Sequence, residues 1–363
     1  MIDLQELLRA TVAAQASDLH LTVGLPPVLR INGELNPMAN HPPATPADLE
    51  VALSAIMSER QREDLKTKGQ TDLSYGLAGV ARFRVNIFRQ RGTLAAVMRV
   101  IPSEVPSYES LGLPAALRGF IEKSRGLVLV TGPTGSGKST TLATIIDAIN
   151  CSRSCHIITL EDPIEFLHRH KRSVVNQREV GSDTNSFTDA LRAALREDPD
   201  VILVGEMRDF ETIQIAITAA ETGHLVFATL HTNDTVQTMD RIIDVFPPYQ
   251  QQQIRMQLSL VIQGVVSQQL VPRSDMPGRV LATEVMVANS AIRSLIREGK
   301  THQIRLVIQT GSKLGMQTLD TSLKSLFDQH KISFQDAMLR AVDQDEFARV
   351  TQDPARPQGK RAV

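Results

Sequence analysis

The sequence predicts an α/β protein: a mostly parallel sheet covered on both faces, with a smaller α+β unit before it and helices after it. From about residue 120, short apolar runs (GLVLVTG, CHIITLED, DVILVGE, HLVFATLH) alternate with helical segments. This alternation is typical of parallel strands joined by helices. The first hundred residues contain shorter alternating runs, and residues after 289 are polar and helical in pattern. A chain of 363 residues accommodates more than one domain.

Composition bounds the domain organisation. Residues 102–114 contain three prolines and lack periodicity, which indicates a linker. The terminal TQDPARPQGKRAV is polar and rich in turn-forming residues, so we expect it to be disordered. The predicted divisions are an N-terminal domain at 1–101, a linker at 102–119, the α/β core at 120–288, a helical region at 289–345 and a disordered tail at 346–363.

Three local patterns predict elements of the N-terminal domain. Asn32-Gly33 separates two short extended runs, and both residues favour positive φ, so we expect a type I′ hairpin turn. Residues 48–69 predict one helix that ends at Gly69. Residues 81–88, ARFRVNIF, alternate between apolar and polar side chains, which predicts a strand whose buried face comprises Phe83, Val85 and Ile87.

Charge and cysteine content exclude several classes of function. The formal net charge is −1, whereas binding to nucleic acid by counterion release needs a basic face, so we expect no nucleic-acid partner. Cys151 and Cys155 are too few for a disulfide framework and lack CxxC spacing, which indicates a reducing compartment. The N-terminus has no signal-peptide pattern, and no apolar run approaches the ~20 residues that span a bilayer. We therefore expect a cytoplasmic protein without a transmembrane segment.

The stretch GPTGSGKST matches the phosphate-binding pattern G-x-x-x-x-G-K-[ST]. It follows an apolar strand and opens a helix with an apolar stripe, which is the context that the motif requires. Its glycines let backbone N–H groups converge on phosphates, Lys138 reaches the β- and γ-phosphates, and the Ser139 hydroxyl can bind Mg²⁺. The residues predicted to bind nucleotide here are Gly132, Pro133, Thr134, Gly135, Ser136, Gly137, Lys138, Ser139 and Thr140.

Carboxylates follow two further strands. In VILVGEMRD, Gly205 stands where an aspartate would hold the magnesium shell, and Glu206 can orient and deprotonate a water; capping of the next turn is the alternative. In TLEDPIEF, Glu161 and Asp162 follow another strand. The carboxyl ends of parallel strands lie at the same edge of a sheet, so these carboxylates could replace the aspartate that is missing at position 205. We assign Glu161 as a metal ligand and place Asp162 at the nucleotide. An ordinary Asp-Pro turn is the alternative.

His224 and His231 bracket the next strand, LVFATL. His231 ends this strand on the phosphate-binding edge, where it could sense a γ-phosphate, and we place His224 at the nucleotide as well. Packing is the alternative role for both. We expect no zinc site, because no cysteine or third histidine lies at ligand spacing.

These motifs, in this order, resemble those of the type II/IV secretion system ATPase superfamily. Its Walker A loop, Asp box, atypical Walker B and His box correspond to 132–140, 159–166, 200–209 and 222–233, and ASDLHL, GVARFRVN and VNQREVG extend the resemblance over about residues 1–320. Within the superfamily, the chain resembles the type IV pilus retraction ATPases. The assembly and type II secretion relatives carry a tetracysteine insertion, which two cysteines cannot form. Those relatives also carry extra N-terminal domains, whereas ASDLHL begins here at Ala16. In addition, AIRSLIRE resembles the retraction signature AIRNLIRE, with Ser294 in place of Asn.

The resemblance implies a RecA-like core, a PAS-like N-terminal domain, a homohexamer and Mg²⁺-dependent ATP hydrolysis. It implies work on an inner-membrane platform protein, a possible paralogous accessory ATPase, and a cytoplasmic location that reaches the inner membrane through protein partners. It also gives the polar face of ARFRVNIF a role, because arginines presented to a γ-phosphate stabilise transition-state charge; a solvated strand face is the alternative. The arginines concerned are Arg82, Arg84 and Arg99.

The segment AIRSLIREGKTHQI, 291–304, lies far from the phosphate motif. Its apolar residues have helical spacing, its arginines share a neighbouring face, and Gly299 predicts the helix end. From these residues alone, a docked helix with a solvated charged face is the simplest interpretation. The resemblance instead implies that the segment delivers mechanical output, through Ile292, Arg293, Leu295, Ile296 and Arg297.

We therefore predict an ATP-hydrolysing motor that drives pilus retraction and twitching motility. A pilus-assembly or secretion ATPase is the nearest alternative, and a nucleotide-gated regulator without mechanical output is a second. A hexameric nucleic-acid translocase is disfavoured by the net charge of −1.

Overall fold

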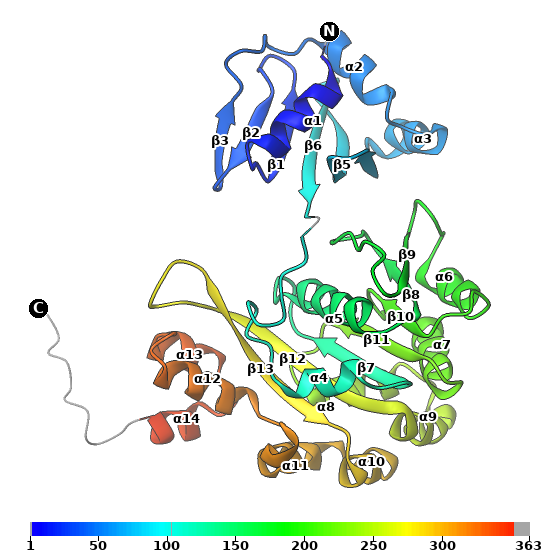
Figure 1. Ribbon diagram of the computed structural model, residues 1–363, viewed down its shortest axis with the longest axis vertical. Helices are drawn as coiled ribbons and strands as arrows, with labels where there is room; N and C mark the ends of the chain where they lie inside the picture. Colours follow the sequence, from blue (N-terminus) through cyan, green and yellow to red (C-terminus); the bar gives the residue numbers. More distant parts are fainter. Residues whose placement is uncertain (1, 103, 352–363) are drawn as a thin grey trace, which may run out of the picture. The chain divides into compact units, whose positions relative to one another are not determined.

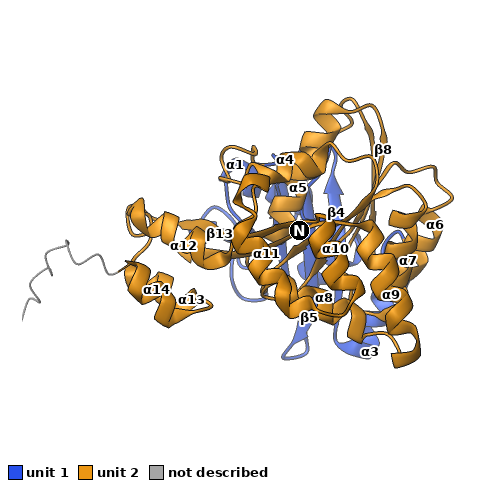
Figure 2. Cartoon of the chain, turned by 90° about the horizontal axis from the view of Figure 1, so that it is seen from below, with its two compact units in different colours: residues 1–105, 163–168, 181–183 blue, residues 106–162, 169–180, 184–363 orange. Residues whose placement is uncertain are grey.

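The structure is a computed structural model that describes residues 2–102 and 104–351. It divides into two compact units (Figure 2). The first unit comprises the residues up to 105 together with 163–168 and 181–183, and the second comprises the remainder. The two short segments come from the stretch that the sequence analysis assigned to the core. Among the described residues, no helix combines the length and apolarity that a bilayer crossing demands.

The first unit is built on an antiparallel sheet. In the described part of this unit, the sheet has six strands in the order β3-β2-β1-β6-β5-β4. Apolar side chains from one face of this sheet pack with leucines of α1, α2 and α3 to form its core. The strands are β1 (Asp18–Thr22), β2 (Val28–Ile31), β3 (Glu34–Pro37), β4 (Gln70–Leu77), β5 (Ala81–Gln90) and β6 (Thr93–Ile101), and the helices are α1 (Leu4–Ala13), α2 (Pro46–Ser54) and α3 (Glu59–Lys68).

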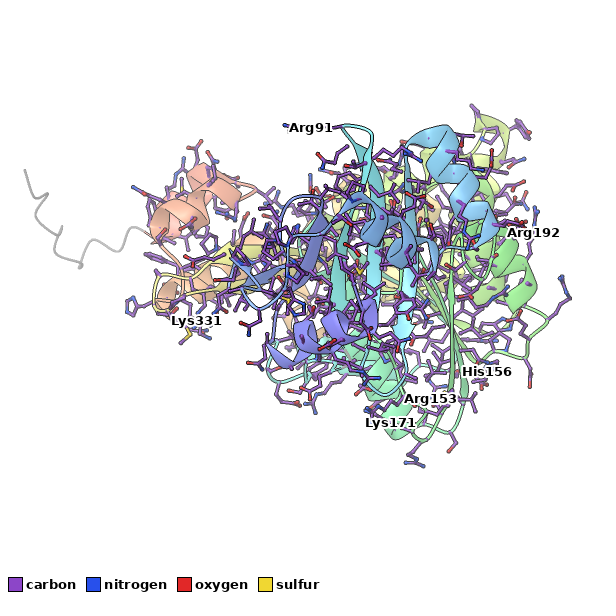
Figure 3. All side chains as sticks on the ribbon, turned by 90° about the horizontal axis from the view of Figure 1, so that it is seen from above. Arg91, Arg153, His156, Lys171, Arg192 and Lys331 are labelled. Carbon is purple, nitrogen blue, oxygen red and sulfur yellow. The ribbon has the colours of Figure 1, made fainter. Side chains whose placement is uncertain are left out.

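Two of the local predictions in this unit are confirmed. Asn32 and Gly33 have φ of 53° and 89° and join β2 to β3, as a type I′ turn requires. The predicted inward face of β5, Phe83, Val85 and Ile87, is fully buried. A second tight turn, Arg91-Gly92, was not predicted; its residues also have positive φ, and Arg91 projects from the tip of the β5–β6 hairpin (Figure 3).

The prediction of one helix over 48–69 is wrong, because two helices occupy this stretch. Ser58 begins α3 by accepting a hydrogen bond from the Gln61 backbone N–H, and the Gln61 side chain accepts from the Ser58 N–H. This capping box starts a new helix that does not continue α2. The predicted end at Gly69 is confirmed, since this residue has left-handed φ of 75°.

The second unit contains the parallel sheet that the sequence predicts. Its described strands follow the order β13-β12-β7-β11-β10-β8-β9, and each neighbouring pair is parallel except β12 and β13 (Figure 1). The strands are β7 (Gly126–Thr131), β8 (His156–Glu161), β9 (Val174–Glu179), β10 (Val201–Val204), β11 (Leu225–Leu230), β12 (Ile262–Pro272) and β13 (Arg279–Val287).

Alternate residues of these strands contribute to two apolar clusters, so helices cover both faces of the sheet. Val128 and Val130 of β7 pack with α4 and α5, whereas Leu127 and Leu129 pack with α6 to α11. The helices are α4 (Ala116–Ile121), α5 (Lys138–Ser152), α6 (Phe187–Ala194), α7 (Phe210–Glu221), α8 (Thr235–Asp244), α9 (Pro248–Val261), α10 (Ser290–Arg297) and α11 (Ile304–Thr310).

Three further helices pack on the β12–β13 hairpin. They are α12 (Leu319–Asp328), α13 (Phe334–Arg340) and α14 (Gln344–Thr351), and Leu323, Ile332 and Phe347 form a small core with Val271. Disorder was predicted from residue 346, but 346–351 belong to α14, where the burial of Phe347 stabilises the helix. The rest of the predicted tail lies outside the described residues.

Gly264 marks the closest approach of β12 to its neighbours. A Cβ at this position would overlap the ring of Phe120, a buried residue of α4, and would lie 2.9 Å from the Met286 carbonyl oxygen of β13. The register between β12 and β7 also shifts here, between Ile262 and Gly264. Glycine therefore lets α4 pack directly on the strand.

We predict that Gly264→Ala destabilises the second unit by about 1–3 kcal/mol, because the added methyl displaces a packed aromatic ring. The measurement is the midpoint of thermal unfolding. Gly119→Ala is the matched control: it adds the same methyl one residue before Phe120, where a Cβ meets nothing within 4 Å. Equal midpoints for the two variants would contradict the packing account.

Candidate active site

The loop that follows β7 is shaped by glycines with positive φ. Gly132 has φ of 140°, and a Cβ there would overlap the Gln268 carbonyl oxygen and approach the Ser136 hydroxyl at 2.7 Å. Gly137, with φ of 89°, precedes α5. From β12, the Gln268 side chain donates through Nε2 to the Ser136 carbonyl oxygen at 2.8 Å. The loop is thus held against β12 at the N-terminus of α5.

Lys138 makes this loop suitable for an anion. Its Nζ donates to the carbonyl oxygens of Gly132 (2.8 Å) and Pro133 (3.1 Å), which curves the loop around the ammonium. Burial lowers the pKa of Lys138, and the nearby charge of Glu206 acts in the opposite direction. A partly buried cation beside a helix N-terminus favours phosphate. The buried Ser136 hydroxyl, which has no hydrogen-bond partner among the described residues, adds a polar group that a phosphate could use.

Glu206 follows β10, and one of its carboxylate oxygens contacts two side chains. Its Oε1 lies 2.6 Å from Nε of Arg208 and 3.1 Å from Nε2 of His231. Burial acts to raise the pKa of Glu206, but the hydrogen bond from Arg208, together with the electrostatic influence of His231 and Arg208, holds this pKa below its usual value. Glu206 is therefore ionised at neutral pH, as a general base must be.

Cross-strand hydrogen bonds hold the Glu206 turn against β11. Thr229 donates through its hydroxyl to the Gly205 carbonyl oxygen, and the Met207 N–H donates to the Thr229 carbonyl oxygen at 3.1 Å. His231 lies two residues beyond Thr229, directly after β11. The structure thus brings His231 and Glu206 together, as their places at the ends of neighbouring parallel strands predict.

Gly205 leaves room for the neighbouring strand. Leu160 of β8 is in register with Val204 of β10, and the Gly205 N–H donates to the Leu160 carbonyl oxygen at 2.7 Å. A Cβ on Gly205 would lie 3.0 Å from that oxygen and 3.3 Å from Cα of Glu161. An aspartate at 205 would therefore crowd the β8 backbone, which explains the glycine in physical terms.

Glu161 lies beside Gly205, at the end of β8. Its Oε1 accepts from the Thr159 hydroxyl (2.7 Å) and from Nε2 of Gln177 (3.1 Å). Asp162 follows, and its charge contributes to the raised pKa of Arg208, so it lies within electrostatic range of that guanidinium. The structure thus places both carboxylates at the phosphate edge of the sheet. Their assignment to metal and nucleotide stays a prediction.

His224 occupies the opposite edge of the sheet. It precedes β11, its backbone carbonyl accepts from the Gly126 N–H at the start of β7, and Nδ1 lies 2.9 Å from the Ala219 carbonyl oxygen. Six strand residues at ~3.3 Å each separate it from His231. The structure therefore does not bring His224 together with His231, and its assignment to the nucleotide stays a prediction.

The three candidate arginines belong to the first unit. Arg84 of β5 pairs with Arg99 of β6, which in turn pairs with Asp18 of β1. The buried Asp18 carboxylate accepts from Nε of Arg99 at 2.8 Å, and 67% of the Arg99 side chain remains exposed. Arg82 lies on the same strand as Arg84. The sheet thus gathers the arginines, and their action on a nucleotide stays a prediction.

Segment 291–304 begins with α10, which lies beside α9 (Figure 1). Ile292 and Ile296 are fully buried in the core, which confirms the packing stripe, and their output role stays a prediction. Arg293 donates through Nη1 to the carbonyl oxygens of Ser259 and Leu260, each at 2.7 Å. Arg293 therefore satisfies the C-terminal end of α9, and it does not form a free charged face.

Other residues of this segment are less buried. Leu295 is partly buried against the core. Arg297 makes a long hydrogen bond of 3.4 Å to the Ser294 hydroxyl and lies partly exposed. Gly299 has φ of 70°, as expected for the helix end.

Two residues of the site were not predicted. Arg208 lies two positions after Glu206, and its place beside a candidate base was a usable signal. Gln268 comes from β12, more than a hundred residues from the loop that it holds. No motif surrounds it, so the sequence contained no comparable signal.

Comparisons with known proteins identify the family of this chain. The family model described as "Type II/IV secretion system protein" matches residues 2–338. The type IV pilus retraction ATPase PilT of Pseudomonas aeruginosa is 50% identical over 346 residues, which cover 95% of this chain and 100% of that protein. The type IV pilus ATPase PilU of the same organism is 40% identical over 340 residues, covering 94% and 89%.

A solved structure extends the likeness to three dimensions. The crystal structure of the pilus retraction motor PilT with bound ADP matches with a TM-score of 0.89 and 50% identity, covering 96% of this chain and 100% of that one. The α/β fold class, with a RecA-like core, is confirmed, as is the resemblance to type IV pilus retraction ATPases.

We predict that Glu206→Gln lowers ATP turnover by about 100-fold or more, because an amide cannot accept the proton of an attacking water. Nucleotide affinity should stay near that of the wild type, since the Lys138 loop is intact. Steady-state phosphate release and equilibrium binding of a fluorescent ATP analogue measure the two effects. Turnover within a few-fold of wild type would reassign the base, with Glu161 as the next candidate.

Proposed function

We propose that this chain, which belongs to the type II/IV secretion system protein family and is an ATP-hydrolysing enzyme, is the motor that retracts a type IV pilus. The observation that best supports this is the extent of the likeness. The identity of 50% to PilT spans all of that protein, and the family model covers residues 2–338, which include the α10 segment as well as the nucleotide site.

We assign the hydrolytic step to groups at one edge of the second unit's sheet. Glu206 orients and deprotonates the attacking water, and its lowered pKa keeps it ionised. His231 and Arg208 contact the same carboxylate oxygen of Glu206. A contact between His231 and the γ-phosphate would therefore affect the position of the base. Lys138 offsets negative charge on the phosphates.

Magnesium is the cofactor expected with ATP, and when bound it supplies charge that stabilises the phosphates during transfer. The residues that we assign to hold it are Ser139, in the first turn of α5, and Glu161. Oxygen ligands of this kind suit Mg²⁺.

The assembly that we propose is a homohexamer in which Arg82, Arg84 and Arg99 act on the nucleotide of a neighbouring copy. Asp18 supports this by orienting Arg99 while leaving most of it exposed. The motor would act from the cytoplasm on an inner-membrane platform protein, with a paralogous ATPase as an accessory partner. The greater identity to PilT than to PilU, 50% against 40%, favours the retraction motor over the accessory role.

An assembly ATPase is the second candidate, because the same ATP hydrolysis could drive the addition of pilus subunits instead of their removal. Deletion of the gene distinguishes the two. We predict that a deletion strain is hyperpiliated and cannot twitch, as expected when pili extend but do not retract. Cells without pili would contradict retraction and favour assembly.

A sharper test uses the surface of α10. The paired change of Arg293 and Arg297 is unsuitable, since Arg293 holds α9. We predict that Arg297→Ala alone keeps ATP turnover within about two-fold of wild type, as expected of a surface change, and abolishes twitching in the complemented deletion strain. Glu298→Ala, on the same helix end, is the control. If Arg297→Ala cells twitch normally, this arginine has no output role.

A further inference from the structure

Glu284 is a buried carboxyl group to which the proposed chemistry gives no task. It lies on β13, and only 6% of its surface is exposed. Its Oε1 accepts a hydrogen bond from the Thr235 N–H at 2.8 Å. Burial raises the pKa of Glu284 despite the opposing hydrogen bonds from Thr235. A carboxyl group is costly to bury, so its place beside Thr235 needs a local explanation.

Thr235 joins Glu284 to the segment that carries His231. It is the first residue of α8, and residues 231–234 connect the end of β11 to this helix. The Thr232 and Thr238 hydroxyls are 2.7 Å apart, and the Thr238 hydroxyl donates to the Asp234 carbonyl oxygen at 2.7 Å. Thr238 of α8 therefore links this helix to Thr232 and Asp234 of the connecting segment, and Glu284 on β13 bonds the first residue of the same helix.

The strand beside Glu284 also contacts the phosphate-binding loop. Glu284 is in register with Ser267 of β12, whose hydroxyl lies 2.7 Å from the hydroxyl of Thr131. Thr131 ends β7, immediately before Gly132. The next β12 residue, Gln268, holds the loop at Ser136. Glu284 thus lies one hydrogen bond from the His231 segment and two strands from the loop.

The outer edge of β13 is bonded to the C-terminal helices. Val285 and Gln317 exchange backbone hydrogen bonds of 2.8 and 3.1 Å, and the Gln317 side chain donates to the Thr283 hydroxyl at 2.8 Å. The Thr283 N–H donates to the hydroxyl of Ser322, on α12, at 3.1 Å. The neighbours of Glu284 are therefore held in place, which makes its carboxyl group a rigid acceptor.

We propose that Glu284 is a positioning residue for ATP hydrolysis, which holds the first N–H of α8 and thereby keeps His231 against Glu206. The His231–Glu206 contact is 3.1 Å long, so a small shift of the segment would break it. A misplacement of ~1 Å at such a site can lower a rate by about 100-fold. The proposal rests on the role given to His231 under the proposed function.

The first test changes the acceptor. In Glu284→Leu, an apolar side chain of similar size replaces the glutamate but cannot accept a hydrogen bond. We expect kcat to fall about 10-fold, with KM for ATP changed by less than about two-fold. Glu284→Gln keeps an acceptor oxygen and should retain kcat within about three-fold. Glu221→Leu, which changes an exposed carboxylate at the end of α7, is the matched control and should keep wild-type kcat.

The second test removes the donor and does not depend on the stability of the Glu284 variants. Position 235 is the first residue of α8, where proline is well tolerated, and Asp234 has the extended φ of −148° and ψ of 171° that suit a residue before proline. Thr235→Pro should therefore fold, as its thermal midpoint will show, and lower kcat by about the same 10-fold factor.

The third test separates positioning from a purely structural role. In a His231→Gln background, Glu284→Leu and Thr235→Pro should each lower kcat by less than about two-fold, because the side chain that they position is gone. Wild-type kcat in Thr235→Pro and Glu284→Leu, or a full 10-fold loss that persists without His231, would overturn the proposal. Wild-type kcat in His231→Gln alone would instead overturn the role given to His231, and with it the premise used here.

Discussion

The hydrogen-bonded contact of Arg208 and His231 with one carboxylate oxygen of Glu206 is the interaction on which the site depends. These residues come from the ends of two neighbouring parallel strands, β10 and β11, and Lys138 joins them electrostatically from the first turn of α5. Hydrogen bonds donated by the Thr229 hydroxyl and the Met207 N–H fix the end of β10 relative to the end of β11. The buried sheet thus determines which charges meet, because each strand is packed between helices and cannot slide independently.

The same sheet explains the less obvious features around the site. Gly205 is small because β8 lies against it, and Glu161 lies at the end of that adjacent strand. On the other flank, β12 supplies Gln268 to the phosphate loop, and β13 supplies Glu284 to the His231 segment. Beyond them lie the C-terminal helices, where Arg293 closes the end of α9. Nucleotide chemistry and the candidate output surface are therefore built on one continuous sheet.

Local signals made much of this predictable. The loop at 132–140, the strand ends at Glu161 and Glu206, and the turn at Asn32-Gly33 each depend on nearby residues and on the direction of parallel strands. The same direction separates His224, which precedes its strand, from His231, which follows it. The split between α2 and α3 was readable in the Ser58–Gln61 capping box but was obscured by the surrounding helical pattern. Gln268, Glu284 and the contacts of Arg293 could not be predicted, because each partner is distant in sequence and no spacing links them.

The central claim is that Arg208 and His231 keep Glu206 ionised as the base, and the pH dependence of kcat/KM for ATP tests it most directly. A base acts only above its pKa, so activity falls as the pH drops through that value. Since Arg208 lowers the pKa of Glu206, Arg208→Ala should move the acid limb of the profile to higher pH than in the wild type, with the thermal midpoint monitored across the same range. An acid limb at the same pH in both proteins would contradict the account.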